Sequence, residues 1–397
     1  MKFPLDASAG KRYRTGTHRS RSARDTVERI GRIAAPLGIT RVANVTGLDT
    51  IGIPVTMVCR PNSRSLAVSQ GKGVTLDAAR ASGLMESVEI FHAERITLPV
   101  RLASLDELRF TTPLVDLRRI ARPEGSTFTE HLRILWVEGA DLLSDQSAWL
   151  PLELMHLDCT RPELPGSGAF LGSSNGLASG NDRWEAVIHA ICEVLERDGQ
   201  GRFGALPEAE QDARRIRLDT IRDPDCVWLL ERYEAAGVSV AVWDTTGPAG
   251  IASFLAGISV VHDWTDGGAR VYYGMGCHPE RNIALSRALT EAAQTRLTMI
   301  IGSRDDAGRS LYARAADAER ATRERQRFDR AVPARSLDEV PTWTSDDLAE
   351  DGRWVLSRLA EGGFDQVLAV DLTMPELGIP VVCVVIPAAE SMGGWLA

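Results

Sequence analysis

Three stretches of the chain repeat one spacing of polar side chains. The stretches Ala79–Glu89, Ala186–Glu196 and Ala284–Gln294 each start with Ala, and polar residues follow three, seven and ten positions later. At about 100° per residue these positions share one face of an α-helix. The polar sets are Ser82, Glu86 and Glu89; His189, Glu193 and Glu196; and Arg287, Glu291 and Gln294. The sequence therefore predicts three helices that each carry one polar, mostly acidic stripe.

The chemistry that such stripes favour is binding of a divalent cation. The face that carries Ser82, Glu86 and Glu89 has no Lys or Arg to relieve the repulsion between the carboxylates. Crowded carboxylates are tolerated when a hard cation lies between them, and Mg²⁺ takes such oxygen ligands together with substrate phosphates. A solvated helix face is the alternative for any single stripe, but a spacing kept three times favours a shared site.

Glycines precede each predicted helix, which we expect near residues 75–95, 182–200 and 282–301. They lie in Gly71-Lys72-Gly73, in Asn175-Gly176 with Gly180, and in Gly274-Met275-Gly276, and we interpret all three stretches as loops. Thr75 is the expected N-cap of the first helix. The pattern predicts an α+β fold built from three repeated strand–loop–helix units around a central site. Glycine loops before helices can bind phosphate through backbone N–H groups. No Walker sequence is present, however, and an exposed loop position is an equal alternative for Lys72.

Composition limits the class of protein. The chain has 397 residues, of which 44% are hydrophobic and 25% charged, as expected for a globular protein with a substantial core. The formal net charge of −9 argues against nucleic-acid binding and against membrane-surface binding. No apolar stretch is long enough to span a bilayer, no signal region begins the chain, and the six cysteines show no metal-binding spacing. We therefore expect a cytoplasmic protein without structural zinc.

The N-terminal segment differs from the rest. Residues 1–24 are basic, and we predict an arm there, followed by a single catalytic domain over 25–397 because no linker interrupts it. One interpretation of the arm is a solvated, partly disordered segment; the other is that its cations fold back over an anionic ligand. Helical spacing is expected over 24–37, and a solvated charged helix and loop over 303–340. In the tail we expect a helix over 346–359 and strands over 365–370 and 379–386.

The stripes and their surroundings resemble a known family. The patterns Ser82-x3-Glu86-xx-Glu89, Glu193-xx-Glu196-Arg197 and Arg287-x3-Glu291-xx-Gln294 are similar to the ATP-binding signature of the YcaO family. The segments RVANVTGLDTIGIPV, RPNSRSLAVSQGKG, SNGLASGN and EAVIHAICEVLERDG agree with this resemblance, which runs from about Gly16 to about Pro387. The text GTHR followed by TGLDTIGIPV is similar in particular to the branch that is paired with TfuA proteins.

The resemblance implies a YcaO-type fold that binds ATP and Mg²⁺, and a reaction that phosphorylates the oxygen of a peptide backbone amide. By position, the residues implied to ligate Mg²⁺ or orient its waters are Glu86, Glu89, Glu193, Glu196 and Glu291. Contacts to phosphate or to the rest of the nucleotide are implied for Arg197, Arg287 and Gln294, secondary contacts for Ser82, Ser174 and Asn175, and looser nucleotide contacts for Arg19 and Thr26. Plain ion pairing for Arg197 and a turn position for Asn175 are the alternatives. Ile90 stands where members often have Arg.

The product depends on the nucleophile. Cys, Ser or Thr side chains give azolines, a sulfide equivalent gives a thioamide, and a backbone amine gives an amidine. Azoline-forming members tend to end in a proline-rich tail, whereas only Pro380 and Pro387 occur in this tail, and no fused leader-binding domain is recognised. We therefore expect thioamide formation in a precursor peptide or protein, with a TfuA-type or leader-binding partner and with a homodimer as a possible assembly. An azoline-forming cyclodehydratase, an amidine-forming enzyme and a nucleotide-binding scaffold without catalysis are the alternatives.

Overall fold

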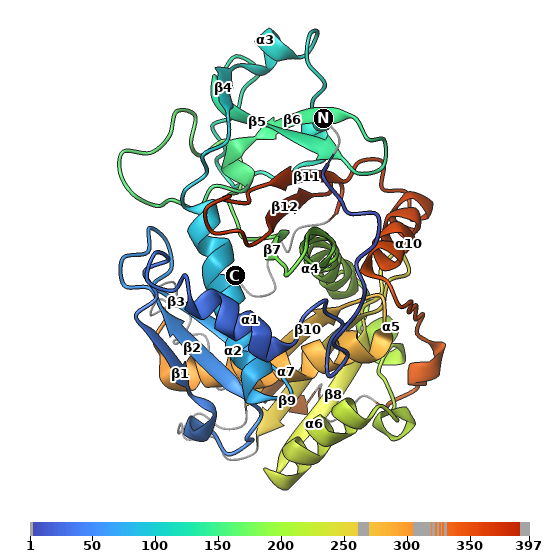
Figure 1. Cartoon of the computed structure of the whole chain (residues 1–397). Helices are drawn as coiled ribbons and strands as arrows, with labels where there is room; N and C mark the ends of the chain where they lie inside the picture. The colour runs from blue at the N-terminus through green and yellow to red at the C-terminus, as the bar shows by residue number, and fades with distance from the viewer. Residues whose placement is uncertain are drawn as a thin grey trace.

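The computed structural model describes residues 3–260, 270–304 and 332–389, together with 319, 322, 323, 325, 326 and 328. Its strands form three sheets, and Figure 1 shows the largest sheet in the upper half of the molecule and the two smaller ones in the lower half. Most of the charged segment expected over 303–340 lies outside the described residues. Within the described part, no helix combines the length and the apolarity that crossing a bilayer requires.

The first small sheet carries the first stripe helix. Its antiparallel strands are β1 (Arg41–Asn44), β2 (Val55–Cys59) and β3 (Val68–Lys72), and helix α2 (Leu76–Ala93) packs on them. The side chain of Thr75 caps α2 by accepting from the N–H of Ala78, which confirms the predicted start. Helix α1 (Ala23–Gly31) packs against α2 and covers it in Figure 1.

The second small sheet carries the third stripe helix. Strands β8 (Val238–Asp244), β9 (Ser253–Val260) and β10 (Arg270–Cys277) are antiparallel in the order β10-β9-β8. Helix α7 (Arg281–Ile301) packs on β10 and β9, and α6 (Pro224–Ala235) packs against α7 and β8.

The large sheet has the order β4-β5-β11-β12-β7, and β6 pairs with the other side of β5. Helix α4, which carries the second stripe, packs on β12 and β7, and α10 packs against α4. The tail supplies α10, β11 and β12, as predicted. The bounds are β4 (Val100–Ala103), β5 (Ile134–Asp141), β6 (Ser147–Pro151), β7 (Leu177–Ser179), β11 (Leu368–Asp371), β12 (Val381–Val385), α3 (Leu105–Leu108), α4 (Arg183–Gly204), α5 (Glu208–Ala213) and α10 (Leu348–Glu361).

The glycine stretches before α2 and α7 are strands, so their prediction as loops was wrong. Gly71 belongs to β3, and Gly274 and Gly276 belong to β10. A Cβ at Gly71 would lie 2.1 Å from the carbonyl oxygen of Ala79, and one at Gly276 would lie 2.1 Å from that of Ala284. These glycines therefore let each helix backbone pack directly on the preceding strand. A strand precedes each stripe helix, but the sheets differ in size and strand order, and the threefold repeat remains a prediction.

The N-terminal segment is anchored to the rest of the molecule at several points, although many of its side chains are exposed. The Nζ of Lys11 forms a buried ion pair with Asp351 of α10, and the indole N–H of Trp184 in α4 donates to the backbone oxygen of Asp6 at 2.7 Å. The Nε2 of His18 lies 3.0 Å from a carboxylate oxygen of Glu280, the residue just before α7. Segments far apart in the sequence therefore hold the arm in place, while side chains such as Asp6, Arg12 and Arg14 are exposed. The division into a basic arm and a single domain remains a prediction.

Candidate active site

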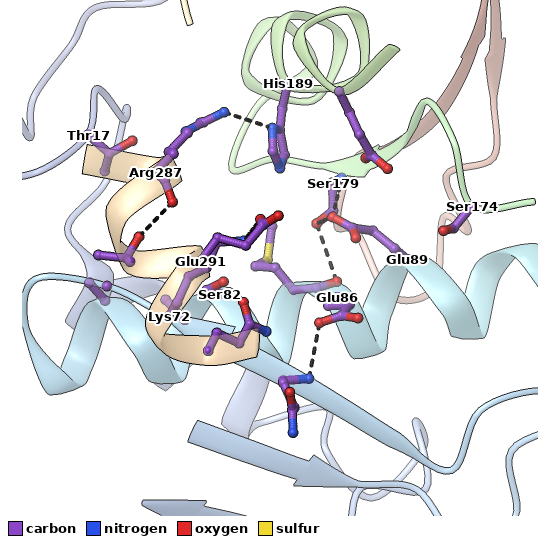
Figure 2. A pocket seen from close by; sticks show the side chains of 18 of the residues that line it. Thr17, Lys72, Ser82, Glu86, Glu89, Ser174, Ser179, His189, Arg287 and Glu291 are labelled. Atoms are coloured by element: carbon purple, nitrogen blue, oxygen red, sulfur yellow. Dashed lines mark hydrogen bonds and ion pairs between the residues drawn. The ribbon is translucent and has the colours of Figure 1, made fainter. Parts of the chain in front are cut away.

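One cavity of about 1180 Å³ gathers the three stripes. It lies between α2, α4, α7 and the N-terminal segment, and Figure 2 shows Glu86, Glu89 and Glu291 turned toward the same space. All of the predicted site residues except Asn175 line it, namely Arg19, Thr26, Ser82, Glu86, Glu89, Ser174, Glu193, Glu196, Arg197, Arg287, Glu291 and Gln294. The fold thus brings together residues that are up to 275 positions apart (Arg19 to Gln294, 294 − 19).

Asn175 is the exception. It lies in the turn before β7, where Gly176 has φ of +75°, and its backbone N–H donates to the hydroxyl of Ser173 at 3.2 Å. The side-chain oxygen of Asn175 is buried and has no hydrogen-bond partner among the described residues. A ligand contact by Asn175 remains a prediction.

The strands fix the carboxylates of the first stripe. The Glu86 carboxylate accepts from the backbone N–H of Gln70 in β3 at 3.1 Å. The Glu89 carboxylate accepts from the N–H and the hydroxyl of Ser179 in β7 at 2.8 and 2.7 Å. In each glutamate only one carboxylate oxygen accepts these bonds. The carboxylate is therefore held in a fixed orientation, while its second oxygen can still bind a further ligand.

Lys72 is a site residue that the sequence left undecided. Its Nζ lies 2.5 Å from one oxygen of Glu291, whose other oxygen accepts from the backbone N–H of Met275 in β10 at 3.1 Å. Burial by itself lowers the pKa of Lys72, but the carboxylates of Glu291, Glu196 and Glu86 outweigh burial and raise that pKa. Lys72 is therefore a charged residue that lines the cavity, and it is not an exposed loop lysine. A strand assignment for β3 would have placed it on the same face as Gln70, two residues earlier.

The carboxylates that line the cavity repel one another. Burial, the largest cause, raises the pKa of Glu89 and of Glu196 to about 8 and that of Glu193 to about 7. Neighbouring carboxylates add to this effect, since Glu291 acts on Glu196 and Glu193 acts on Glu89. Burial raises the pKa of Glu86 as well. Burial and this repulsion thus oppose ionisation of the glutamates in the ligand-free protein, and a bound cation would favour their ionised form.

Cations line one side of this acidic group. A guanidinium nitrogen of Arg287 lies 3.2 Å from Nδ1 of His189 and donates to the backbone oxygen of Cys277 at 3.2 Å. Burial and the nearby Arg287 hold the pKa of His189 well below its usual range, so the imidazole is neutral and accepts from Arg287. Arg197 forms a 2.7 Å ion pair with Glu193, as the plain ion-pair alternative predicted.

Glu185 is a site residue that sequence reasoning missed. It lines the cavity, is only 2% exposed, and accepts from the backbone N–H of Asn181 at 2.9 Å and from that of Ser20. Thr26 reaches the same place, where its hydroxyl bonds the side-chain oxygen of Asn181 at 3.1 Å. The available signal was position: Glu185 lies four residues before His189 and so extends the same stripe by one turn.

The residues present fit Mg²⁺ bound together with a polyphosphate. Among the residues that the structure describes, no three His, Cys, Asp or Glu side chains are grouped closely enough to hold a metal ion by themselves. Mg²⁺ does not require such a cage, because it usually binds one or two carboxylates and completes its shell with water and phosphate oxygens. The glutamates supply the first kind of ligand, and Arg19, Arg287 and Lys72 supply charge for an anion.

Comparison with known proteins decides the family. A family model described as YcaO cyclodehydratase, ATP- and Mg²⁺-binding, matches residues 70–390. The chain belongs to the YcaO family. The predicted cofactors, ATP and Mg²⁺, are those that this family binds.

Relatives match over nearly the full length. An uncharacterized protein of Methanothermobacter thermautotrophicus is 35% identical over 377 residues, which is 92% of this chain and 93% of that protein. A protein of Rhizobium leguminosarum bv. trifolii, called an uncharacterized protein in the tfuA 3′ region, is 35% identical over 380 residues, which is 89% of this chain and 84% of that one.

Solved structures confirm the predicted YcaO-type α+β fold. The structure of YcaO from Methanopyrus kandleri bound with AMPPCP and Mg²⁺ superposes with a TM-score of 0.72 at 23% identity, covering 96% of this chain and 95% of that one. A heterocyclase in complex with substrate and cofactor superposes with a TM-score of 0.79 at 21% identity and covers 98% of this chain. This chain spans 55% of that heterocyclase, and at such identities the likeness establishes the fold alone.

Proposed function

We propose that this protein activates a peptide backbone amide by phosphorylating its oxygen in an ATP- and Mg²⁺-dependent reaction. The observation that carries the proposal is the convergence of glutamates from α2, α4 and α7 on one cavity with cations beside them. When bound, Mg·ATP would supply the phosphoryl group that turns the amide oxygen, a very poor leaving group, into phosphate.

The chain's own residues would provide position and charge. Glu86, Glu89 and Glu291 are held by backbone N–H groups of neighbouring strands, so their carboxylates are oriented before any ligand arrives. Together with Glu193 and Glu196 they would ligate Mg²⁺ directly or through water. Arg19, Arg197, Arg287 and Lys72 would neutralise phosphate charge, and Gln294, Ser82, Ser174, Asn175 and Thr26 would make the smaller polar contacts with the nucleotide.

The product that we propose is a thioamide, formed with a TfuA-type partner. Sulfide adds at the amide carbon, the phosphorylated oxygen leaves as phosphate, and the carbon–sulfur double bond replaces the carbon–oxygen one, so that ATP is converted to ADP. The support is the resemblance of the N-terminal segments to the TfuA-paired branch and the name of the Rhizobium relative. The family description and the heterocyclase structure favour a second candidate, an azoline-forming cyclodehydratase.

Mass spectrometry separates these products. The chain is incubated with ATP, Mg²⁺, sulfide and the peptides encoded beside it, with and without a TfuA protein. Replacement of oxygen by sulfur in a peptide supports thioamide formation, while loss of water supports an azoline or an amidine. Glu193→Gln and Glu196→Gln should each abolish ATP consumption while the fold is retained by circular dichroism. Normal turnover in both variants would remove the basis of the proposed function, and nucleotide binding without any turnover would favour a scaffold.

A further inference from the structure

The cavity extends beyond the glutamates toward the C-terminal end of α2. Figure 2 shows Ser174 past Glu89, at the end opposite to Thr17. The backbone N–H of Leu157 donates to the carbonyl of Ala93 at 3.1 Å, which places this wall beside the last turn of α2. Four aliphatic side chains line this end, namely Leu66, Ile90, Leu157 and Leu177, together with Ser65, Cys159 and Ser174.

The opposite end differs in chemistry. There the lining includes Thr17 of the N-terminal segment, and Figure 2 shows Ser82 and Arg287 on the same side of the glutamates as Thr17. Phosphates are bound by such guanidinium and hydroxyl groups, whereas the four aliphatic side chains of the other end offer them no hydrogen bond or charge. The total volume of about 1180 Å³ also exceeds the roughly 300–1,000 Å³ of a site for one small ligand. The cavity therefore has room for a second, partly apolar ligand next to the nucleotide.

We propose that the apolar end binds an apolar side chain of the acceptor peptide, close to the amide that is modified. This inference rests on the proposed function, and it specifies the substrate as a peptide with a Leu-like residue near the reacting bond. Along α2, Ala93 lies four residues from Glu89 and seven from Glu86, or about 6 and 10 Å at 1.5 Å per residue. An extended peptide covers about 3.3–3.6 Å per residue. The apolar residue thus lies two or three positions from the modified amide.

A thiol at the same end can report on occupancy. Cys159 is exposed, lines the cavity and has its Sγ 3.6 Å from the backbone oxygen of Leu157. Of the other five cysteines, Cys59 is half-buried and the rest are buried. Alkylation of Cys159 by N-ethylmaleimide, followed by mass spectrometry of proteolytic fragments, therefore measures access to this end of the cavity, and a Cys159→Ser variant identifies the signal.

The test compares three probes in the full chain: acetyl-Leu-Gly-Leu amide, acetyl-Asp-Gly-Asp amide and Mg·AMPPCP. Burial of a Leu side chain corresponds to a preference of about ten- to a hundredfold, so the Leu peptide should protect Cys159 at a concentration at least tenfold below that of the Asp peptide. Mg·AMPPCP alone should leave the alkylation rate unchanged. The proposal would be overturned by equal effects of the two peptides or by no protection at the highest soluble concentration. Protection by Mg·AMPPCP alone would also overturn it, because it would place the nucleotide base at the apolar end.

A variant pair completes the experiment. Leu66→Ser removes one half-buried apolar side chain of the lining, and Leu48→Ser removes an exposed leucine that does not line the cavity. We expect Leu66→Ser to lose about tenfold in protection by the Leu peptide, with unchanged Mg·AMPPCP affinity, and Leu48→Ser to behave as wild type. Equal behaviour of the two variants would contradict the assignment. Protection requires no turnover, so a chain that is protected by the Leu peptide but consumes no ATP and modifies no peptide would refute the proposed function, while peptide binding at the apolar end would still stand.

Discussion

Replacing Glu196 by Gln should stabilise the ligand-free protein while removing its response to Mg·ATP. Burial and the neighbouring Glu291 raise the pKa of Glu196 from 4.5 to about 8. The folded state therefore binds this proton more tightly than the unfolded chain does. As the pH rises above 4.5 the unfolded state loses the proton first, so the free energy of unfolding of the wild type falls until the pH passes about 8. A Gln side chain has no such pH dependence.

The size of the effect follows from the interval between the two pKa values. One pKa unit corresponds to about 1.4 kcal/mol. At pH 7 the interval above 4.5 gives an advantage of up to about 3 kcal/mol for the variant, and above pH 8 it gives up to about 5 kcal/mol. Lys72 attracts the ionised form of Glu196, and the pKa of about 8 already includes that attraction. A stabilising change at a functional position is expected where activity requires crowded like charges.

Chemical unfolding at pH 6, 7 and 9, with and without Mg·AMPPCP, measures both effects. At a hundredfold excess over its dissociation constant the ligand should stabilise the wild type by about 2.7 kcal/mol and the variant by much less. Glu210→Gln, at an exposed position of α5, is the matched control and should change neither quantity. A Glu196→Gln protein that is less stable than wild type at pH 9, or that keeps the full response to Mg·AMPPCP, would refute the reasoning.

Three further predictions concern binding and stability. Because Mg²⁺ needs ionised carboxylates, the affinity for Mg·AMPPCP should rise between pH 6 and 9, and binding should release protons. Calorimetry in buffers of different ionisation enthalpy measures this release, and a finding of no released protons would contradict the prediction. Arg60→Met should lower the free energy of unfolding by up to about 3–5 kcal/mol, since it removes the buried cation of Glu94 and leaves only the more exposed Arg95 beside that carboxylate. Adding Glu94→Gln should restore part of the loss. Gly71→Ala should lower the free energy of unfolding by more than about 3 kcal/mol, because its Cβ would meet the backbone of Ala79. Gly47→Ala, in open space, should lower it by less than about 1 kcal/mol. Similar unfolding midpoints for the two variants would count against the strand–helix packing.

The local parts of the fold were predictable from the sequence. The stripe helices have the expected positions because a 3.6-residue period and a capping residue such as Thr75 are properties of a short segment. Pairing between distant strands is not predictable in this way. Leu368 of β11 pairs with Asp141 of β5, more than 200 residues away, and no local pattern specifies that partner. Gly71 was misinterpreted for the same reason, since its close contact with a helix is invisible in the sequence around it.

The site was predictable where several residues share one helix face. Glu193 and Glu196 follow from periodicity, and their assignment to a nucleotide site came from the family resemblance. Lys72 and Glu185 were undecided or missed because their roles depend on partners from other elements, Glu291 for the first and the backbone N–H of Ser20 for the second. A single charged residue carries no signal of this kind until the fold supplies its neighbour.

The early residues that line the cavity are held in place by the last third of the chain. Gly10 forms a backbone bridge with Asp347, and Lys11 pairs with Asp351. During synthesis, then, these contacts can form only after residues that follow the N-terminal segment by more than 330 positions have been made. A nascent polypeptide that has not yet reached α10 lacks both contacts, so this wall of the cavity is secured only once α10 has been made.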